Sequence, residues 1–169
     1  AEMINRVRSD FRILTRSLLT GIPEVEEFMI PVPFPHEDNA RELGLQMRED
    51  TLAHLKAGGV IILFPAGKVA MSEGWWGPAV EGEWNVFTHK IVRSTGATIL
   101  PVYFPGQNSR LFHIASHLHQ ALRYGLLFHE VRNKIGRRID VKIGEVIGHE
   151  RLREFADARR FAAVKARLR

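Results

Sequence analysis

The stretch Gly58-Gly59-Val60-Ile61-Ile62-Leu63-Phe64-Pro65-Ala66-Gly67-Lys68 decides the fold class. The paired glycines stop a preceding helix, because glycine readily takes the left-handed backbone conformation that ends one. Residues 60–64 are a continuous apolar run, which is typical of a strand buried on both faces in a helix-covered sheet. Pro65 ends strand pairing because it has no backbone N–H. The sequence therefore predicts a buried strand with a turn at its carboxyl end, the edge where α/β proteins bind ligands.

Helical and extended segments alternate on both sides of this stretch. Upstream, apolar residues recur at helical spacing from Ala40 to Leu55, after Asp38 or Asn39 as a cap, and three prolines at 31, 33 and 35 predict a loop before them. The other predicted elements are the tail of a helix over 2–8, a strand over 11–14, a short helix over 23–27, a strand over 28–30, a helix over 84–94 closed by Gly96, a strand over 98–104, helices over 109–122 and 126–133, a strand over 138–143 and a basic amphipathic helix over 150–169. They predict one α/β domain spanning 1–169, with a central mixed, largely parallel sheet covered by helices.

The composition fits one globular domain with a basic surface. The chain has 169 residues, 45% of them hydrophobic, which is enough for a single core. It has no cysteine, and this excludes a disulfide framework, a thiol nucleophile and a thiolate metal site. The net charge of +5 favours anionic partners such as phosphorylated substrates, nucleic acid or an acidic lipid surface. The longest apolar run is far shorter than the roughly 20 residues of a spanning helix, so none is predicted.

The turn over residues 64–68 is the first candidate binding site. Gly67 allows the backbone to approach a ligand closely, and Lys68 adds a positive charge at the same rim. A nucleotide-binding P-loop is excluded, because that pattern needs a glycine where Ile62 stands and a hydroxyl where Val69 stands. On local chemistry alone, the segment also fits an ordinary turn with a solvated lysine.

Five short motifs then follow in one order along residues 2–148. They are Phe28-Met29-Ile30-Pro31-Val32, Phe64-Pro65-Ala66-Gly67, Leu100-Pro101-Val102, Gly106-Gln107-Asn108-Ser109 and Asn133-Lys134-Ile135-Gly136-Arg137. With these motifs the chain resembles the lysophospholipid acyltransferase superfamily, and within it the bacterial branch labelled hemolysin or ornithine-lipid acyltransferase. The resemblance implies a glycerolipid-acyltransferase-like fold and transfer of a fatty acyl group to a lysolipid hydroxyl in membrane lipid biosynthesis. It also implies acyl carrier protein or coenzyme A as the acyl donor, no other cofactor, and a peripheral position on the cytoplasmic face of the membrane.

The resemblance assigns catalysis to a pair of residues that this sequence lacks. In the family, a His followed after four residues by an Asp forms the first motif, in which the His is the general base and the Asp orients it. No such pair precedes the strand over 11–14, so we expect it upstream of Ala1 and expect this chain alone to bind without turnover. His149 and Glu154 have a similar spacing, but they open the last helix, where residues five apart do not share a face.

The resemblance also implies where the substrate binds. The acceptor is expected to contact the turn, with its anionic headgroup at Gly67 and Lys68, while two polar residues line or brace the pocket rim. The predicted binding residues are Phe64, Pro65, Ala66, Gly67, Lys68, Asn108 and Ser109. Two departures from the family pattern leave open an acceptor other than a simple glycerol phosphate: Ala66 replaces the common acid, and the segment 31–33 has no arginine.

Other residue groups leave alternatives open. His113 and His117 share a helical face near His119, but no carboxylate or cysteine accompanies them, so no metal site is predicted. The tryptophans 75, 76 and 84 fit either a membrane-interface cover over an acyl chain or a lid over the core. The last helix fits an anionic membrane surface or packing on the domain. The alternative function is a non-catalytic basic membrane- or nucleic-acid-binding module, although the apolar strands lack the basic and aromatic residues that bind nucleic acid.

Overall fold

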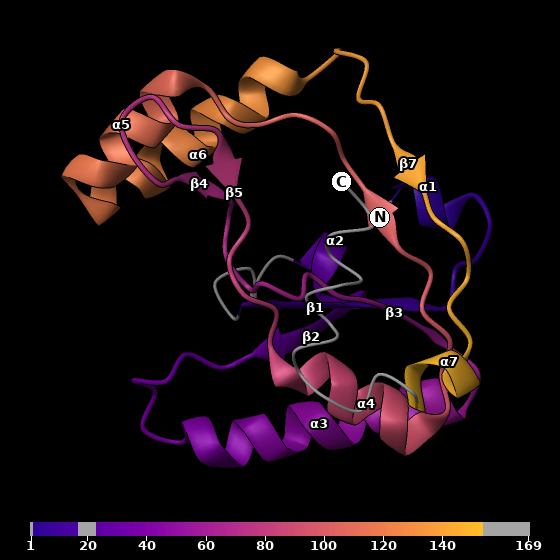
Figure 1. The fold of residues 1–169 in the computed structure, drawn as a ribbon. Coiled ribbons are helices and arrows are strands. Elements are labelled where there is room, and N and C mark those ends of the chain that lie inside the picture. The colour runs from indigo at the N-terminus through magenta and orange to yellow at the C-terminus, as the bar shows by residue number, and fades with distance from the viewer. Residues whose placement is uncertain (1, 17–22, 154–169) are drawn as a thin grey trace.

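The structure, a computed structural model, describes residues 2–16 and 23–153 (Figure 1). At its centre lies a three-stranded parallel sheet in the order β2-β1-β3. The strands are β1 (Phe11–Arg16), β2 (Met29–Val32) and β3 (Val60–Ile62). Ile13 of β1 pairs with Met29 on one side and with Ile62 on the other. The predicted α/β class is confirmed, and the three upstream strands lie side by side.

Two helices form a layer on one side of this sheet (Figure 1). Helix α3 (Ala40–Lys56) packs on β2 and β3, and α4 (Val86–Thr95) packs on α3. Thr51 on α3 is fully buried. On the strands, Phe11, Leu14 and Ile30 are also buried, with at most 6% of each residue exposed. The core therefore lies between the sheet and α3. The shorter helices α1 (Glu2–Asn5) and α2 (Pro23–Glu26) precede β1 and β2.

The predicted glycine stops of these helices are confirmed, whereas the starts differ, because Asn39 precedes α3 without a side-chain cap hydrogen bond and α4 begins at Val86 instead of residue 84. Gly58 follows α3 with φ +86° and Gly96 follows α4 with φ +68°, both in the left-handed region that favours glycine. Asn85 caps the start of α4, where its Oδ1 accepts a hydrogen bond of 2.8 Å from the Phe87 N–H. Local capping signals thus set the helices that flank β3.

The prediction that residues 60–64 form a strand buried on both faces is wrong. β3 ends at Ile62, its three residues are only half-buried, and the Phe64 side chain is 62% exposed. The reason is its position, because β3 forms the edge of the sheet, whereas β1 lies in the middle.

The prediction that residues 98–104 join the central sheet is also wrong. β6 (Val102–Tyr103) pairs antiparallel with β7 (Lys142–Ile143) in a separate two-stranded sheet. Ile99 extends this ladder by exchanging two backbone hydrogen bonds, of 3.0 and 2.8 Å, with Ile147. Pro101 lacks an N–H and so interrupts the ladder. The central sheet is therefore parallel throughout its three strands instead of mixed.

Helices α5 (Arg110–Leu118) and α6 (Gln120–Lys134) form a second helical layer apart from α3 and α4 (Figure 1). They were predicted over 109–122 and 126–133, but the break lies at His119, whose backbone is extended with φ −159°. A hairpin of β4 (Met71–Ser72) and β5 (Ala79–Val80) packs beside α5, in a stretch for which no helix or strand was predicted. Strands of two residues are too short to show a periodic pattern in the sequence.

The last described element, α7 (His149–Arg153), packs on α4. His149 Nδ1 lies 3.6 Å from Glu150 Oε1, the carboxylate of the next residue in the chain. Glu154 and the rest of the helix predicted over 150–169 lie outside the described residues.

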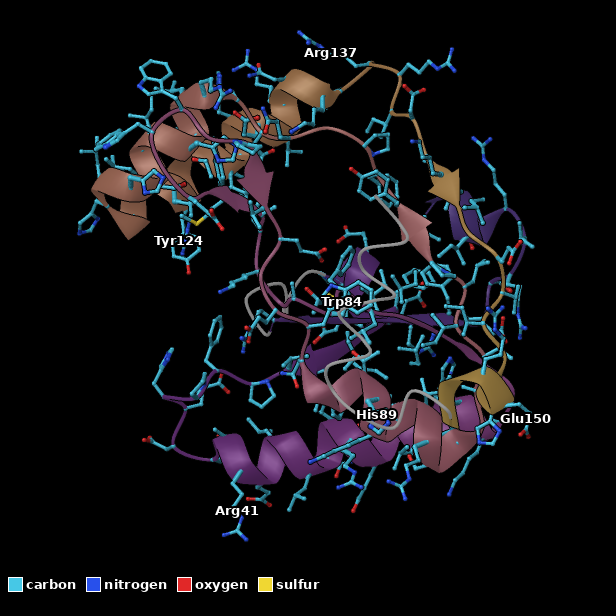
Figure 2. All side chains as sticks on the ribbon, in the orientation of Figure 1. Arg41, Trp84, His89, Tyr124, Arg137 and Glu150 are labelled. Carbon is cyan, nitrogen blue, oxygen red and sulfur yellow. The ribbon has the colours of Figure 1, made fainter. Side chains whose placement is uncertain are left out.

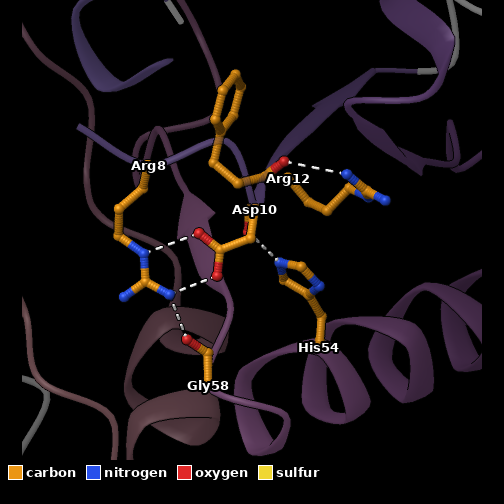
Figure 3. Close-up of polar contacts among 6 residues, drawn as sticks. Arg8, Asp10, Arg12, His54 and Gly58 are labelled. Carbon is orange, nitrogen blue, oxygen red and sulfur yellow. Dashed lines mark hydrogen bonds and ion pairs between the residues drawn. The ribbon is translucent and has the colours of Figure 1, made fainter. Parts of the chain in front are cut away.

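Polar contacts fasten the amino-terminal edge of the sheet (Figure 3). Arg8 donates to both carboxylate oxygens of Asp10 and, over 2.8 Å, to the carbonyl oxygen of Gly58. The pKa of the Asp10 carboxyl is lowered, chiefly by the hydrogen bond from Arg8. His54 Nε2 donates to the Asp10 carbonyl oxygen over 2.9 Å, and the Val60 N–H donates to the same oxygen over 3.2 Å. The end of α3 is thereby joined to the starts of β1 and β3.

Candidate functional site

The carboxyl ends of the three parallel strands form the edge at which a ligand site is expected. β1 ends at Arg16 and β2 ends at Val32, and these two residues are paired. β3 ends at Ile62, and residues 63–68 continue beyond it. The predicted turn over 64–68 therefore lies just after β3, at the carboxyl edge of the sheet.

The turn is closed by its own backbone. The Gly67 N–H donates to the Phe64 carbonyl oxygen over 2.9 Å. Gly67 has φ +62°, which L side chains rarely adopt, although a Cβ added there would meet no atom within 4 Å. The glycine is thus required by backbone conformation, and the space beside it is open. With the exposed ring of Phe64, the turn presents both an aromatic surface and accessible backbone.

One further hydrogen bond attaches the turn to the start of α4. The Asn85 N–H donates to the Pro65 carbonyl oxygen over 2.9 Å, while the Asn85 side chain caps the helix. Ala66, between Pro65 and Gly67, is half-buried. The turn is therefore positioned both by β3 and by the first residues of α4.

Lys68 is exposed, and its aliphatic stem lies against Gly82. A Cβ added at Gly82 would lie 2.3 Å from Lys68 Cε and 3.3 Å from Lys68 Nζ. The absence of a side chain at position 82 therefore leaves the room that the lysine stem occupies. Packing of the stem on neighbouring backbone keeps the ammonium group near the turn while it stays in contact with water.

Arg16 is a second cation at the same edge, and the sequence analysis missed it. Its Nη1 donates to the Pro33 carbonyl oxygen over 2.9 Å, and its guanidinium carbon lies 5.2 Å from the centre of the Phe34 ring. These contacts hold the side chain beside the loop that follows β2, and they leave other guanidinium N–H groups for a ligand. A basic residue two positions after Leu14, the last apolar residue of β1, was the available signal.

Asn108 and Ser109 contact a different part of the chain. Asn108 Oδ1 accepts a hydrogen bond of 2.6 Å from Lys134 Nζ on α6. Ser109 caps α5, where its Oγ accepts from the Phe112 N–H over 3.2 Å. The Ser109 N–H donates to Glu130 Oε2 over 3.0 Å, and its hydroxyl donates to the other carboxylate oxygen. The structure thus brings these two residues to α5 and α6, and residues 64–68 to α4.

Glu130 is buried, with 4% of the residue exposed, yet it keeps a low pKa. Burial raises the pKa of its carboxyl, but the two hydrogen bonds from Ser109 and the nearby Lys134 ammonium outweigh burial and lower the pKa below its ordinary value. The ion pair with Lys134 spans 3.4 Å on one face of α6. Glu130 therefore serves as a charged anchor for the cap of α5.

The histidines of α5 are held in ways that disfavour a metal. His113 is fully buried, and its Nδ1 accepts a hydrogen bond of 3.3 Å from the Ser72 N–H. In the neutral ring the proton then lies on Nε2, which has no hydrogen-bond partner among the described residues, so neither nitrogen offers a free lone pair. His117 Nε2 lies 3.4 Å from Ser72 Oγ, and His119 Nδ1 accepts from the Ala121 N–H over 3.1 Å. Within residues 2–16 and 23–153, no group of three His, Asp or Glu residues could hold a metal ion.

The three tryptophans divide between surface and core. Trp75 and Trp76, in the β4–β5 hairpin, are 50% and 76% exposed. Arg110 Nη1 braces their loop by donating to the carbonyl oxygens of Trp76 and Gly77 over 2.9 and 2.7 Å. Trp84 instead packs against the buried Val92 of α4. Trp84 is therefore a core residue. Trp75 and Trp76 are exposed, and for this pair the cover over an acyl chain at the membrane interface stays a prediction.

A small cleft lies between the loop after β2 and helix α3. Its volume is about 70 Å³, and its lining residues are Pro31, Pro33, Glu37, Leu43, Gln46, Met47 and Asp50. It has room for only a few water molecules at roughly 30 Å³ each. Because two of its side chains are carboxylates, it is also a poor site for an anionic headgroup.

Comparisons with protein-family models, with curated proteins and with solved structures find no match to this chain. Among the helices that the structure describes, none combines the length and the apolar composition needed to cross a membrane. The chemistry of the sheet edge is therefore the basis for assigning a function.

Proposed function

We propose that the chain binds the anionic headgroup of a lysolipid at the carboxyl edge of its parallel sheet, as part of an acyltransferase. The observation that supports this most directly is the pair of cations at that edge. Arg16 ends β1, and Lys68 lies in the turn that follows the neighbouring strand β3. Next to Lys68 in the chain, the Gly67 turn exposes backbone in a conformation that suits a closely approaching anion.

In the proposed reaction, the hydroxyl oxygen of the lysolipid attacks the carbonyl carbon of a fatty acyl thioester. A C–O ester bond forms as the C–S bond to acyl carrier protein or coenzyme A breaks. A general base takes the hydroxyl proton, which then passes to the leaving thiolate. The sequence from Ala1 to Arg169 contains no His followed after four residues by Asp, so binding and orientation of the acceptor are the part proposed for it.

The fold and the setting belong to the same proposal. The order β2-β1-β3, with the Phe64–Gly67 motif directly after β3, is compatible with the glycerolipid-acyltransferase-like fold that the motifs imply. Because lysolipids reside in bilayers, the protein would act as a peripheral protein at the cytoplasmic membrane face. Its acyl donor would be acyl carrier protein or coenzyme A, with no further cofactor.

Lys68→Ala tests the proposal through binding of lysophosphatidate, whose headgroup is a phosphate. We expect affinity to fall about tenfold, equivalent to ~1.4 kcal/mol for one lost charge-assisted contact. Gly82→Ala should also weaken binding, because its methyl group would displace the lysine stem while the charge is kept. Lys56→Ala, an exposed lysine at the end of α3, is the matched control and should bind as the wild type does.

Unchanged lysophosphatidate affinity in Lys68→Ala would refute the role of this residue. Acyl transfer from acyl-coenzyme A or acyl carrier protein is measured separately with the full-length protein. Vesicle binding without acyl transfer, and without preference for a lysolipid, would favour the non-catalytic binding module instead.

A further inference from the structure

Helix α6 has exposed apolar side chains on a face other than the one that packs on the domain. Arg123, Leu126, Leu127 and Glu130 are half-buried or buried and face the packed side of the helix. Apart from Leu122, which is 50% exposed on another face of the helix, four large side chains are exposed, namely Tyr124 at 49%, Phe128 at 81%, Val131 at 59% and the C-cap residue Ile135 at 75%. Their spacing of four, three and four residues places them within roughly 60° of the helix circumference. We call these four residues the outer stripe.

Basic residues outnumber acids around the outer stripe. Residues 119–140 contain five basic residues, Arg123, Arg132, Lys134, Arg137 and Arg138, and two acids, Glu130 and Asp140. Glu130 is 4% exposed and pairs with Lys134, the exposed Asp140 pairs with Arg138 over 3.0 Å, and Arg123 lies on the packed side of the helix. Figure 2 shows Tyr124 on the lower side of the α5–α6 region and Arg137 at its top. Arg132 and Arg137 are therefore the basic residues that add positive charge near the apolar stripe.

We infer that the outer stripe docks on an anionic lipid bilayer. An amphipathic helix of this kind lies in the plane of the interface, with apolar side chains at the boundary of headgroups and acyl chains and with arginines among the lipid phosphates. Each basic residue near an anionic surface contributes about 1 kcal/mol, which is a roughly fivefold gain in binding. The surface is distinct from the helix predicted over 150–169, and the inference does not depend on acyl transfer.

Two other occupants fit the stripe less well. A second copy of the chain would form a symmetric interface, in which each stripe meets its equivalent and the two basic surfaces approach each other. Single-stranded nucleic acid would match the charge and could stack on Tyr124 and Phe128. Val131 and Ile135, however, offer branched aliphatic surface with no ring for a base to stack on, and this favours lipid.

Co-sedimentation of the full chain with vesicles tests the inference. The vesicles are equimolar phosphatidylcholine and phosphatidylglycerol, compared with pure phosphatidylcholine. Phe128→Ser/Ile135→Ser should lower the partition coefficient on the anionic vesicles at least tenfold. Ile143→Ser is the matched control, because Ile143 is 61% exposed on β7 and lies outside the stripe. Circular dichroism checks that each variant keeps its helix content.

Arg132→Gln/Arg137→Gln separates the charge contribution from the apolar one. We expect about a 25-fold loss on anionic vesicles, as two roughly fivefold effects multiply, and little change on neutral ones. Equal binding by wild type and Phe128→Ser/Ile135→Ser would overturn the inference. So would binding of a single-stranded RNA oligomer without vesicle binding, or a stripe-dependent dimer in sedimentation velocity. Vesicle binding, together with a lack of acyl transfer by the full-length protein, would uphold the inference while counting against the proposed enzyme.

Discussion

Gly59→Ala should destabilise the fold through a single side chain, His54. A Cβ added at Gly59 would lie 2.3 Å from His54 Nε2 and 2.5 Å from Cε1, far inside van der Waals contact. The imidazole would have to move, and its hydrogen bond of 2.9 Å to the Asp10 carbonyl oxygen would be lost. Because Gly59 does not have a positive φ, the alanine backbone itself is not strained.

The expected loss of unfolding free energy is about 1–3 kcal/mol. Losing the hydrogen bond costs roughly 0.5–1.5 kcal/mol, and crowding that is only partly relieved costs up to about 1–3 kcal/mol. The Asp10 carbonyl oxygen keeps a second donor, the Val60 N–H, which limits the cost. Alanine also restricts the unfolded chain more than glycine does, which raises the free energy of unfolding by roughly 0.4–1 kcal/mol and offsets part of the loss.

Urea unfolding followed by tryptophan fluorescence measures this loss. Gly44→Ala, inside α3 with no atom within 4 Å of its added Cβ, is the matched control and should gain about 0.5–1 kcal/mol. In a His54→Ala background the cost of Gly59→Ala should vanish, because the ring is gone. A Gly59→Ala protein as stable as wild type, or an equal cost in both backgrounds, would refute the reasoning.

Two predictions concern acid stability. Because folding lowers the pKa of the Glu130 carboxyl, this group stabilises the fold above its unfolded-state pKa, and the stabilisation is lost as pH falls through its folded-state pKa. Glu130→Gln should therefore lower the free energy of unfolding by about 1–3 kcal/mol at neutral pH and flatten its pH dependence in unfolding titrations. Burial, followed by the charge of Arg110, lowers the pKa of His113, so stability should fall as pH drops below about 6.5. His113→Gln should abolish that decline; an unchanged decline would assign it to other groups.

Local signals predicted much of the fold. The glycines after α3 and α4 act within a few residues, so they were recognised in the sequence. The Asn85 cap of α4 is equally local but was not predicted, because the helix was expected to begin at 84. The neighbours of a strand cannot be recognised in this way. The apolar run over 60–64 looks like a central strand, yet β3 lies at the sheet edge, and residues 98–104 pair with a segment some 40 residues further on.

In the candidate site, too, local features were predicted and contacts between distant segments were not. The turn at Gly67 and the cation at Lys68 follow from residue type and position, and the structure places them at the carboxyl edge of the sheet. Arg16 was missed because its relevance depends on which strand lies beside β3. Asn108 and Ser109 were grouped with the turn by motif order, whereas in the structure they join α5 to α6 through Lys134 and Glu130.

The antiparallel ladder pairs residues 99–103 with residues 142–147. The segment between them, which includes α5 and α6, is therefore an insertion whose two ends lie side by side. A segment of this kind can be shortened, extended or exchanged as a cassette without rethreading the parallel sheet. The proposed lipid-docking helix can therefore vary without a change in the proposed headgroup turn, provided that the contacts of α5 with the β4–β5 hairpin are kept, so that relatives could keep one acceptor chemistry while adapting to different membranes.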